Sequence, residues 1–89
     1  MDARPKGRVK LQTPAFMKLV RARVVARFEI SKDGKTERVT LDLGTGIPAT
    51  DAEILAFLAT VEWTPKTISG LAVSDVQVMT FARTESAPR

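Results

Sequence analysis

The sequence predicts an α+β fold: a three-stranded antiparallel sheet packed on one main helix, with a short N-terminal helix before it. The sheet is indicated by alternating apolar and polar residues over 23–30 and 38–43, and by a third alternating stretch over 73–83. The main helix is indicated by apolar residues at helical spacing between the second and third strands: Ile54, Leu55, Leu58 and Val61. The expected order of elements is therefore α-β-β-α-β.

The first two strands are expected to form a hairpin. The apolar residues of the first strand share one parity, so one of its faces should be buried: Val24, Ala26, Phe28 and Ile30. Between the strands, Asp33-Gly34 is a hairpin turn signal, because both residue types accept positive φ at low cost.

Local signals set the expected bounds of the helices. Thr13 is expected to cap the short helix, with Pro14 at its first position. The main helix should begin with a capping box over Thr50–Glu53, in which each side chain satisfies an amide of the first turn. Pro65 should end that helix at about residue 62 or 63, and the ring of Trp63 is expected to anchor the core.

Composition excludes several kinds of site. The 89 residues suffice for one small domain, with 44% hydrophobic and 27% charged residues, and they contain no cysteine and no histidine. Disulfides, thiol chemistry and the commonest general base are therefore absent. The carboxylates fall in turns, in helix caps and on the polar, solvent-facing sides of strands, and no Asp-rich calcium loop occurs. We therefore expect that the protein is not an enzyme and binds no cofactor and no metal.

Charge is concentrated at the start of the chain. Residues 1–27 carry eight Lys or Arg and one Asp, whereas residues 28–89 carry six Lys or Arg and nine Asp or Glu. Residues 1–12 are interpreted as a flexible basic lead or linker remnant, residues 13–83 as the domain, and residues 84–89 as a disordered tail. An alternative interpretation of the basic lead is a nucleic-acid-binding or membrane-surface-binding module. No apolar run reaches the roughly 20 residues that span a bilayer, so any membrane anchor is expected outside these residues.

The last strand is unusual because both of its parities carry apolar residues. Val76 and Val78 share one parity, while Met79 and Phe81 share the other. Either the strand contains a bulge or is covered on both faces, or one face or edge receives a partner. Before it, Lys66 to Leu71 is expected to be a loop that turns on Ser69-Gly70.

Taken in order, several short motifs resemble the C-terminal domain of TonB-family energy-transducing proteins and the matching domain of TolA. The resemblance covers about residues 12–83. The first motif is a Pro-aromatic segment, Gln12-Thr13-Pro14-Ala15-Phe16, and the second is a strand with an Asp-Gly turn, Arg23–Ile30 with Asp33-Gly34. The third is a helix end with an aromatic residue, a spacer and Pro, Trp63-Thr64-Pro65. The fourth is a Gly-containing loop before a strand that ends at Phe, Gly70 through Phe81.

The resemblance implies a non-enzymatic peptide-binding domain in the periplasm, whose parent protein is anchored in the inner membrane. It would grip a short segment of an outer-membrane transporter by β-strand addition and couple it to inner-membrane motor proteins. The partner-binding residues would be Val73, Ser74, Asp75, Val76, Gln77, Val78, Met79, Thr80 and Phe81, with Gln12, Pro14 and Phe16. Under this interpretation no nucleic acid is expected, and pairing of the same strand with its copy in a homodimer is a further alternative.

Overall fold

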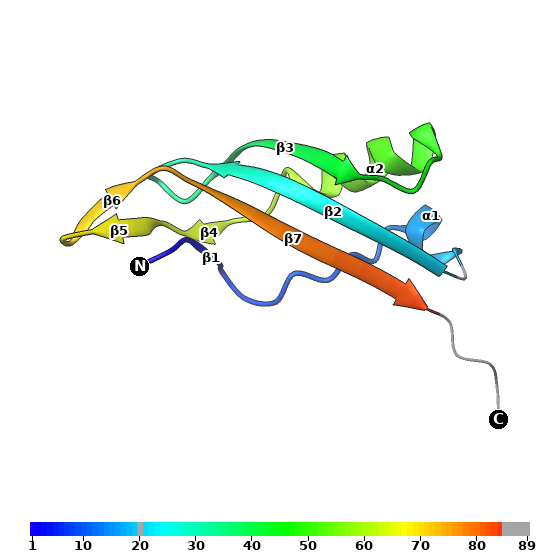
Figure 1. The fold of residues 1–89 in the computed structure, drawn as a ribbon, viewed down its shortest axis with the longest axis horizontal. Helices are drawn as coiled ribbons and strands as arrows, with labels where there is room; N and C mark the ends of the chain where they lie inside the picture. Colours follow the sequence, from blue (N-terminus) through cyan, green and yellow to red (C-terminus); the bar gives the residue numbers. More distant parts are fainter. Residues whose placement is uncertain (20, 85–89) are drawn as a thin grey trace, which may run out of the picture.

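The computed structural model describes residues 1–19 and 21–84, so Val20 and the expected tail from residue 85 lie outside the described residues. Nine elements follow one another within the described residues (Figure 1). They are β1 (Arg4–Pro5), α1 (Pro14–Met17), β2 (Arg21–Ile30), β3 (Thr36–Leu43), α2 (Pro48–Leu58), β4 (Trp63–Thr64), β5 (Lys66–Ile68), β6 (Leu71–Val73) and β7 (Asp75–Thr84).

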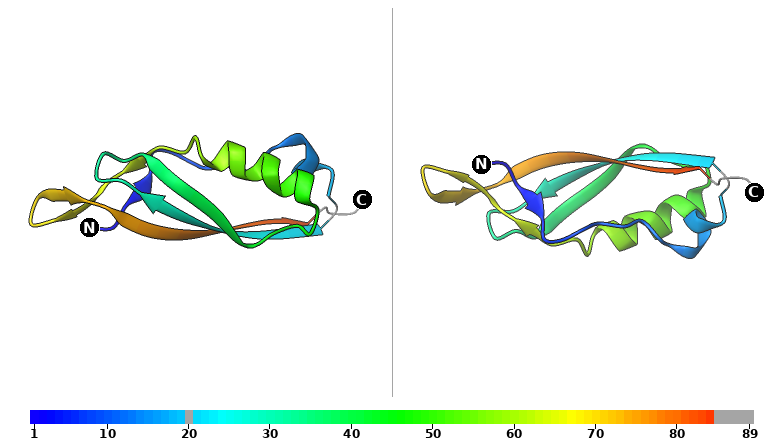
Figure 2. Two further views of the ribbon diagram at one scale, coloured as in Figure 1. Left: turned by 90° about the horizontal axis from the view of Figure 1, so that it is seen from above. Right: turned by 90° about the horizontal axis from the view of Figure 1, so that it is seen from below.

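The α+β prediction is confirmed. The main sheet has the order β3-β2-β7, and both neighbouring pairs are antiparallel. Helices α1 and α2 lie on one side of this sheet, so the molecule has two layers (Figure 2). The predicted parity of β2 explains the arrangement, because its apolar residues at 24, 26, 28 and 30 are fully buried and face the helix layer.

The core lies between the sheet and α2. Ile54 and Leu58 of α2 are fully buried against it, as is Trp63. The Trp63 ring meets Phe28 edge to face, with centroids 5.0 Å apart, and its Nε1 donates a 2.9 Å hydrogen bond to Oγ1 of Thr36. The predicted role of Trp63 as a core anchor is therefore confirmed, and its one polar atom is satisfied within the core.

The β2–β3 hairpin turns where the sequence predicts. Gly34 has φ of +81°, its amide donates to the carbonyl of Ser31, and its carbonyl accepts the amide of Trp63 at 2.8 Å. A Cβ at Gly34 would collide with the backbone carbonyl of Trp63. Glycine is thus required here both by the backbone angle and by the close approach of the chain that follows α2.

The predicted capping box is wrong. Helix α2 begins three residues earlier, at Pro48, with Ile47 as an N-cap that makes no side-chain capping bond. It ends at Leu58, before the predicted end at residue 62 or 63. Proline suits the first helical position because its missing N–H needs no partner there. Thr50 is instead buried inside the helix. Asp51 turns back to the preceding loop and accepts bonds from the amide and hydroxyl of Thr45 at 2.9 and 2.7 Å.

The expected loop after the main helix is a second hairpin. Strands β5 and β6 pair over three residues each, and Ser69 and Gly70 at the turn both have positive φ, at 52° and 81°. Two consecutive residues with positive φ are typical of a tight two-residue hairpin turn. The strands were not predicted because three residues are too few to show a clear alternation in the sequence. The last strand consequently begins at Asp75 rather than Val73.

The N-terminal segment also differs from the expectation of a flexible lead. Strand β1 pairs antiparallel with β4, and the contact continues on both sides of that pair. The amide of Thr67 donates to the carbonyl of Met1, and the amide of Lys6 donates to the carbonyl of Glu62, each at 2.9 Å. Residues 1–6 therefore lie along residues 62–67.

Burial explains why this segment packs. Ala3 and Leu11 belong to the core, and Val9 packs partly buried against it. These residues share odd parity, whereas the even positions between them carry exposed basic side chains. The segment bends at Lys6 and Gly7, where Gly7 has φ of +89°, and on each side of the bend it buries odd positions as a strand does.

Candidate functional site

The candidate site is the outer edge of β7. This strand pairs with β2 over ten residue pairs, from Ile30 opposite Asp75 to Arg21 opposite Thr84, without a register shift. Within residues 1–19 and 21–84, β7 is hydrogen-bonded to no other strand. Its second side is therefore a row of backbone groups that another strand can pair with.

The backbone groups that face outward can be identified from the alternation. The amide of Ser31, just after β2, donates to the carbonyl of Lys35 on the β3 side. In an antiparallel ladder successive residues alternate in direction, so odd residues of β2 face β3 and even residues face β7. The even residues of β2 pair with odd residues of β7. The outward N–H and C=O groups of β7 thus belong to Val76, Val78, Thr80 and Ala82, and of these the Val76 amide already donates to the Asp75 carboxylate.

The apolar residues at the two parities of β7 lie on opposite faces of the sheet. Phe81 is buried and Met79 half-buried, and both face the helix layer. Val76 and Val78 lie on the other face and remain 50% and 48% exposed. A bulge in this strand, or cover on both faces, was one interpretation of the sequence, and the unbroken register and the exposed valines contradict it.

The opposite edge of the sheet is less suited to a partner strand. Strand β3 has two register irregularities against β2, next to Val25 and Ile30. Its first residue, Thr36, donates its hydroxyl to the carbonyl of Val61 at 2.7 Å, so the chain after α2 already covers that end. Bulges and cover are the usual ways in which an edge is kept from pairing.

Asp75 organises the beginning of β7. Its carboxylate accepts hydrogen bonds from the amide of Ala3 at 3.1 Å, the amide of Val76 at 2.8 Å and Nε2 of Gln77 at 2.8 Å. The ammonium of Lys66 lies 3.9 Å away. The Gln77 hydrogen bond, opposed by burial and helped by the two amides and Lys66, holds the pKa of Asp75 below its ordinary value.

A shallow pocket of about 310 Å³ lies at the other end of β7. Gln12 and Phe16 line it together with Ala82 and Arg83, so the structure brings two of the predicted N-terminal residues to the strand. The Phe16 side chain is only 3% exposed and belongs mainly to the core. Pro14 is exposed at the start of α1 and does not line the pocket.

The first two predicted residues of the last strand lie elsewhere. Val73 ends β6, and Ser74 connects it to β7. Both line an open groove of about 570 Å³ between the two hairpins, together with Lys32 and Asp33 of the first hairpin. The remaining predicted residues, 75–81, form the first seven positions of β7.

The sequence did not predict which residues lie next to the outer edge of β7. Lys10 and Leu11 line the 310 Å³ pocket with Arg83, whose Nε donates a 2.7 Å bond to the carbonyl of Leu19. The signal that could have revealed the packed N-terminal segment was its alternation of small or apolar residues with basic ones. Pro5 and Gly7 interrupt that pattern and suggest a linker instead.

The described chain contains no helix that is long and apolar enough to cross a membrane. Comparison of the sequence with models of known protein families gives no match, and comparison with curated proteins gives none either.

Proposed function

We propose that this domain is a non-enzymatic peptide-binding module that adds an extended segment of a partner protein to the outer edge of β7. The observation that carries the proposal is the one-sided pairing of this ten-residue strand within the described residues. Strand addition needs a straight edge with regular backbone groups and side chains in alternate positions. The β7 edge offers both, while irregularities and cover make the β3 edge a poorer template.

The chemistry predicts modest and reversible binding. Each backbone hydrogen bond contributes roughly 0.5–1.5 kcal/mol net. The Val76 amide already donates to Asp75, so the Val76 carbonyl and the outward groups of Val78, Thr80 and Ala82 would supply about four to six such bonds. The exposed Val76 and Val78 would add apolar contacts with alternate side chains of the partner. After the cost of association, we expect a dissociation constant roughly in the micromolar-to-millimolar range.

The biological setting of this proposal is that of the TonB-like proteins that the sequence resembles. In it, the domain works in the periplasm and grips a segment of an outer-membrane transporter. An inner-membrane anchor outside these residues would link it to motor proteins. A pull along β7 would load the row of backbone bonds together, which suits a mechanical coupler.

The direct test is a titration of isotope-labelled domain with a short strand-forming peptide, followed by amide NMR shifts. Shifts that are largest along residues 75–84 are expected. Shifts confined to β3, α2 or the β5–β6 hairpin would refute the proposed edge.

A second copy of the chain is the main competing occupant, because the same exposed backbone groups would pair with their own copy. Light scattering over a concentration series distinguishes the two. A monomer at titration concentrations favours the peptide, and a dimer that the peptide fails to dissociate favours self-pairing.

A further inference from the structure

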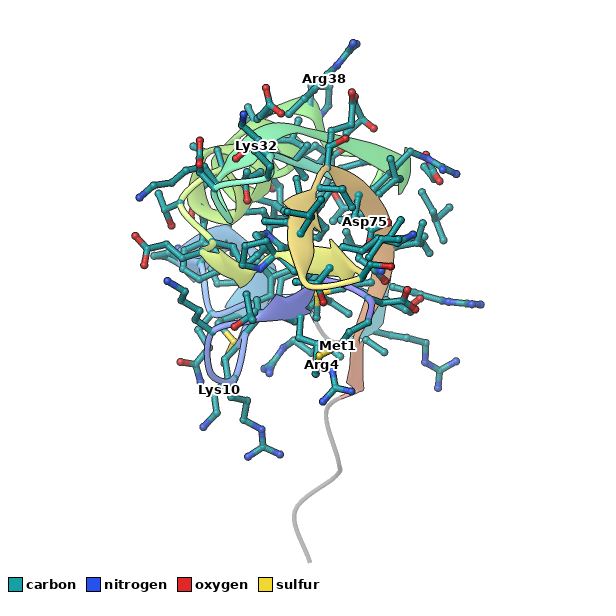
Figure 3. The ribbon with its side chains drawn as sticks, turned by 90° about the vertical axis from the view of Figure 1, so that its left-hand side faces the viewer. Met1, Arg4, Lys10, Lys32, Arg38 and Asp75 are labelled. Atoms are coloured by element: carbon teal, nitrogen blue, oxygen red, sulfur yellow. The ribbon has the colours of Figure 1, made fainter. Side chains whose placement is uncertain are left out.

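Four basic residues of the N-terminal segment are here called the basic row: Arg4, Lys6, Arg8 and Lys10. All four are exposed, whereas the odd positions between and beside them include the buried Ala3 and Leu11. Figure 3 shows Arg4 and Lys10 extending towards the side opposite to Lys32 and Arg38. The row thus places four exposed cations within seven residues, on a segment that bends at Lys6 and Gly7.

The basic row takes no part in the ion pairs of the described residues. Those pairs join arginines and lysines outside the row to nearby carboxylates: Arg27 to Asp42, Lys35 to Glu62, Arg38 to Glu29 and Lys66 to Asp75. Asp2 is the one acidic residue among the first 27, and Glu62, which lines a pocket with Lys6, Arg8 and Lys10, pairs with Lys35. The row therefore presents a concentrated positive charge to solvent.

The N-terminal segment that carries the basic row comes close to both ends of β7. The Ala3 amide donates to Asp75 at the beginning of β7, and Lys10 lines a pocket with Ala82 and Arg83 near the end of the strand. Between these points the segment runs beside α2 in the helix layer, beneath the β7 edge in the view of Figure 1 (Figures 1 and 2). Lys6, Arg8 and Lys10 line a pocket there with Phe57 and Glu62. A strand added to β7 would have this segment on the side that faces the helix layer.

We propose that the basic row makes the β7 edge selective for acidic segments, a specificity that rests on the proposed strand addition. Alternate side chains of an added strand point to opposite faces. One set would meet the exposed Val76 and Val78, which favours apolar residues, and the other set would face the basic row, which favours Asp or Glu. The partner is thus an extended segment in which apolar and acidic residues alternate.

The test uses two acetylated and amidated peptide probes that differ only in charge: Thr-Val-Glu-Val-Glu-Val-Glu-Thr and the same peptide with Gln for each Glu. Dissociation constants are measured at low and high salt for the wild type, for Arg4→Gln/Lys10→Gln and for Lys32→Gln/Arg38→Gln. The last variant removes the same charge from the opposite side of the molecule. Amide spectra of each variant establish that it keeps the wild-type fold.

At low salt we expect the Glu probe to bind roughly tenfold more tightly than the Gln probe, as three exposed ion pairs would give. High salt should reduce the difference to about twofold, because exposed charges are screened. Arg4→Gln/Lys10→Gln should lose most of the preference, and Lys32→Gln/Arg38→Gln should keep it.

Equal binding of both probes by the wild type, with shifts along β7, would refute the selectivity and leave strand addition intact. Binding of neither probe at millimolar concentration would refute both. Phosphatidylglycerol vesicles or oligothymidylate provide the last comparison. If either bound more tightly than the Glu probe and depended on Arg4 and Lys10, a lipid or nucleic-acid surface would replace the peptide as the partner of the basic row.

Discussion

The backbone amide of Ala3 donates a hydrogen bond of 3.1 Å to Oδ2 of Asp75, 72 residues further along the chain. The same carboxylate also holds the Val76 amide and the Gln77 side chain, and it lies near Lys66. Asp75 thereby joins the N-terminal segment, β5 and the first residues of β7. This junction lies where the candidate edge begins and joins the start of the N-terminal segment to it.

Acid is expected to loosen the Asp75 junction. The Gln77 hydrogen bond is the main reason that the pKa of Asp75 lies below its ordinary value of 3.8. A carboxyl group with a lowered folded pKa stabilises the fold above its unfolded pKa, and that contribution is lost as pH falls through the folded pKa. Urea titrations should therefore show a declining free energy of unfolding below about pH 4, with a smaller decline for Asp75→Asn.

At neutral pH, Asp75→Asn should lose about 1–2 kcal/mol, because the amide no longer accepts charge-assisted bonds. Asp33→Asn in the exposed hairpin turn is the control for removal of one carboxylate and should lose less at neutral pH. Equal stability of Asp75→Asn and the wild type at neutral and acidic pH would show that the junction does not stabilise the fold.

Gly34 and Gly70 offer a matched pair of glycine substitutions. Both have φ of +81°, but a Cβ at Gly34 would collide with the Trp63 carbonyl, whereas a Cβ at Gly70 meets nothing within 4 Å. Gly70→Ala should cost only the backbone strain of roughly 1–2 kcal/mol. Gly34→Ala should cost clearly more in chemical denaturation, since the chain after α2 must also move. Equal losses would mean that the close approach is easily relieved.

The hydrogen bond between Trp63 and Thr36 should be visible as a coupling energy. Trp63→Phe removes the buried indole N–H and leaves the Thr36 hydroxyl with its bond to the Val61 carbonyl. We expect a loss of about 2–4 kcal/mol for Trp63→Phe and about 1–2 kcal/mol for Thr36→Val. In the double variant the losses should fall short of additivity by about 0.5–1 kcal/mol. Fully additive losses would argue that the bond contributes nothing beyond packing.

Proline substitutions at two neighbouring positions should distinguish the outward side of β7 from the side that pairs with β2. The Val78 amide faces outward, so Val78→Pro should keep the β2–β7 ladder while blocking one bond to an added strand. The Met79 amide faces β2, so Met79→Pro should break the ladder and unfold the domain. Circular dichroism reports folding, and titration with the Gln probe reports binding. Unfolding by Val78→Pro together with tolerance of Met79→Pro would reverse the assigned directions.

The sheet and main helix could be predicted because their signals are long. The apolar parity of Val24 to Ile30 and the helical spacing of Ile54 and Leu58 extend over several repeats, so one burial pattern fits them. The capping box failed because Pro48 supplies an earlier helix start that the Thr50–Glu53 pattern concealed. Thr50 is a core position of α2, where burial matters more than its capping preference.

The candidate site was only partly accessible from the sequence. Val76 and Val78 could be placed on an exposed face once the strand was recognised, but the order of strands in the sheet depends on long-range pairing that no local period encodes. The packing of residues 1–12 was hidden for a different reason. Their high charge suggested a solvated linker, while the small Ala3 and the isolated Leu11 provide too little apolar surface to reveal a strand.

Hydrogen exchange of individual β7 amides tests the proposed edge most directly. In the monomeric domain the amides of Gln77, Met79 and Phe81 should be protected by β2, whereas those of Val78, Thr80 and Ala82 should exchange rapidly. Saturation with a strand-forming probe should protect the second set and so remove the alternation. Protection of Val78 and Thr80 in the unliganded monomer, or rapid exchange that persists at saturation, would contradict strand addition at β7.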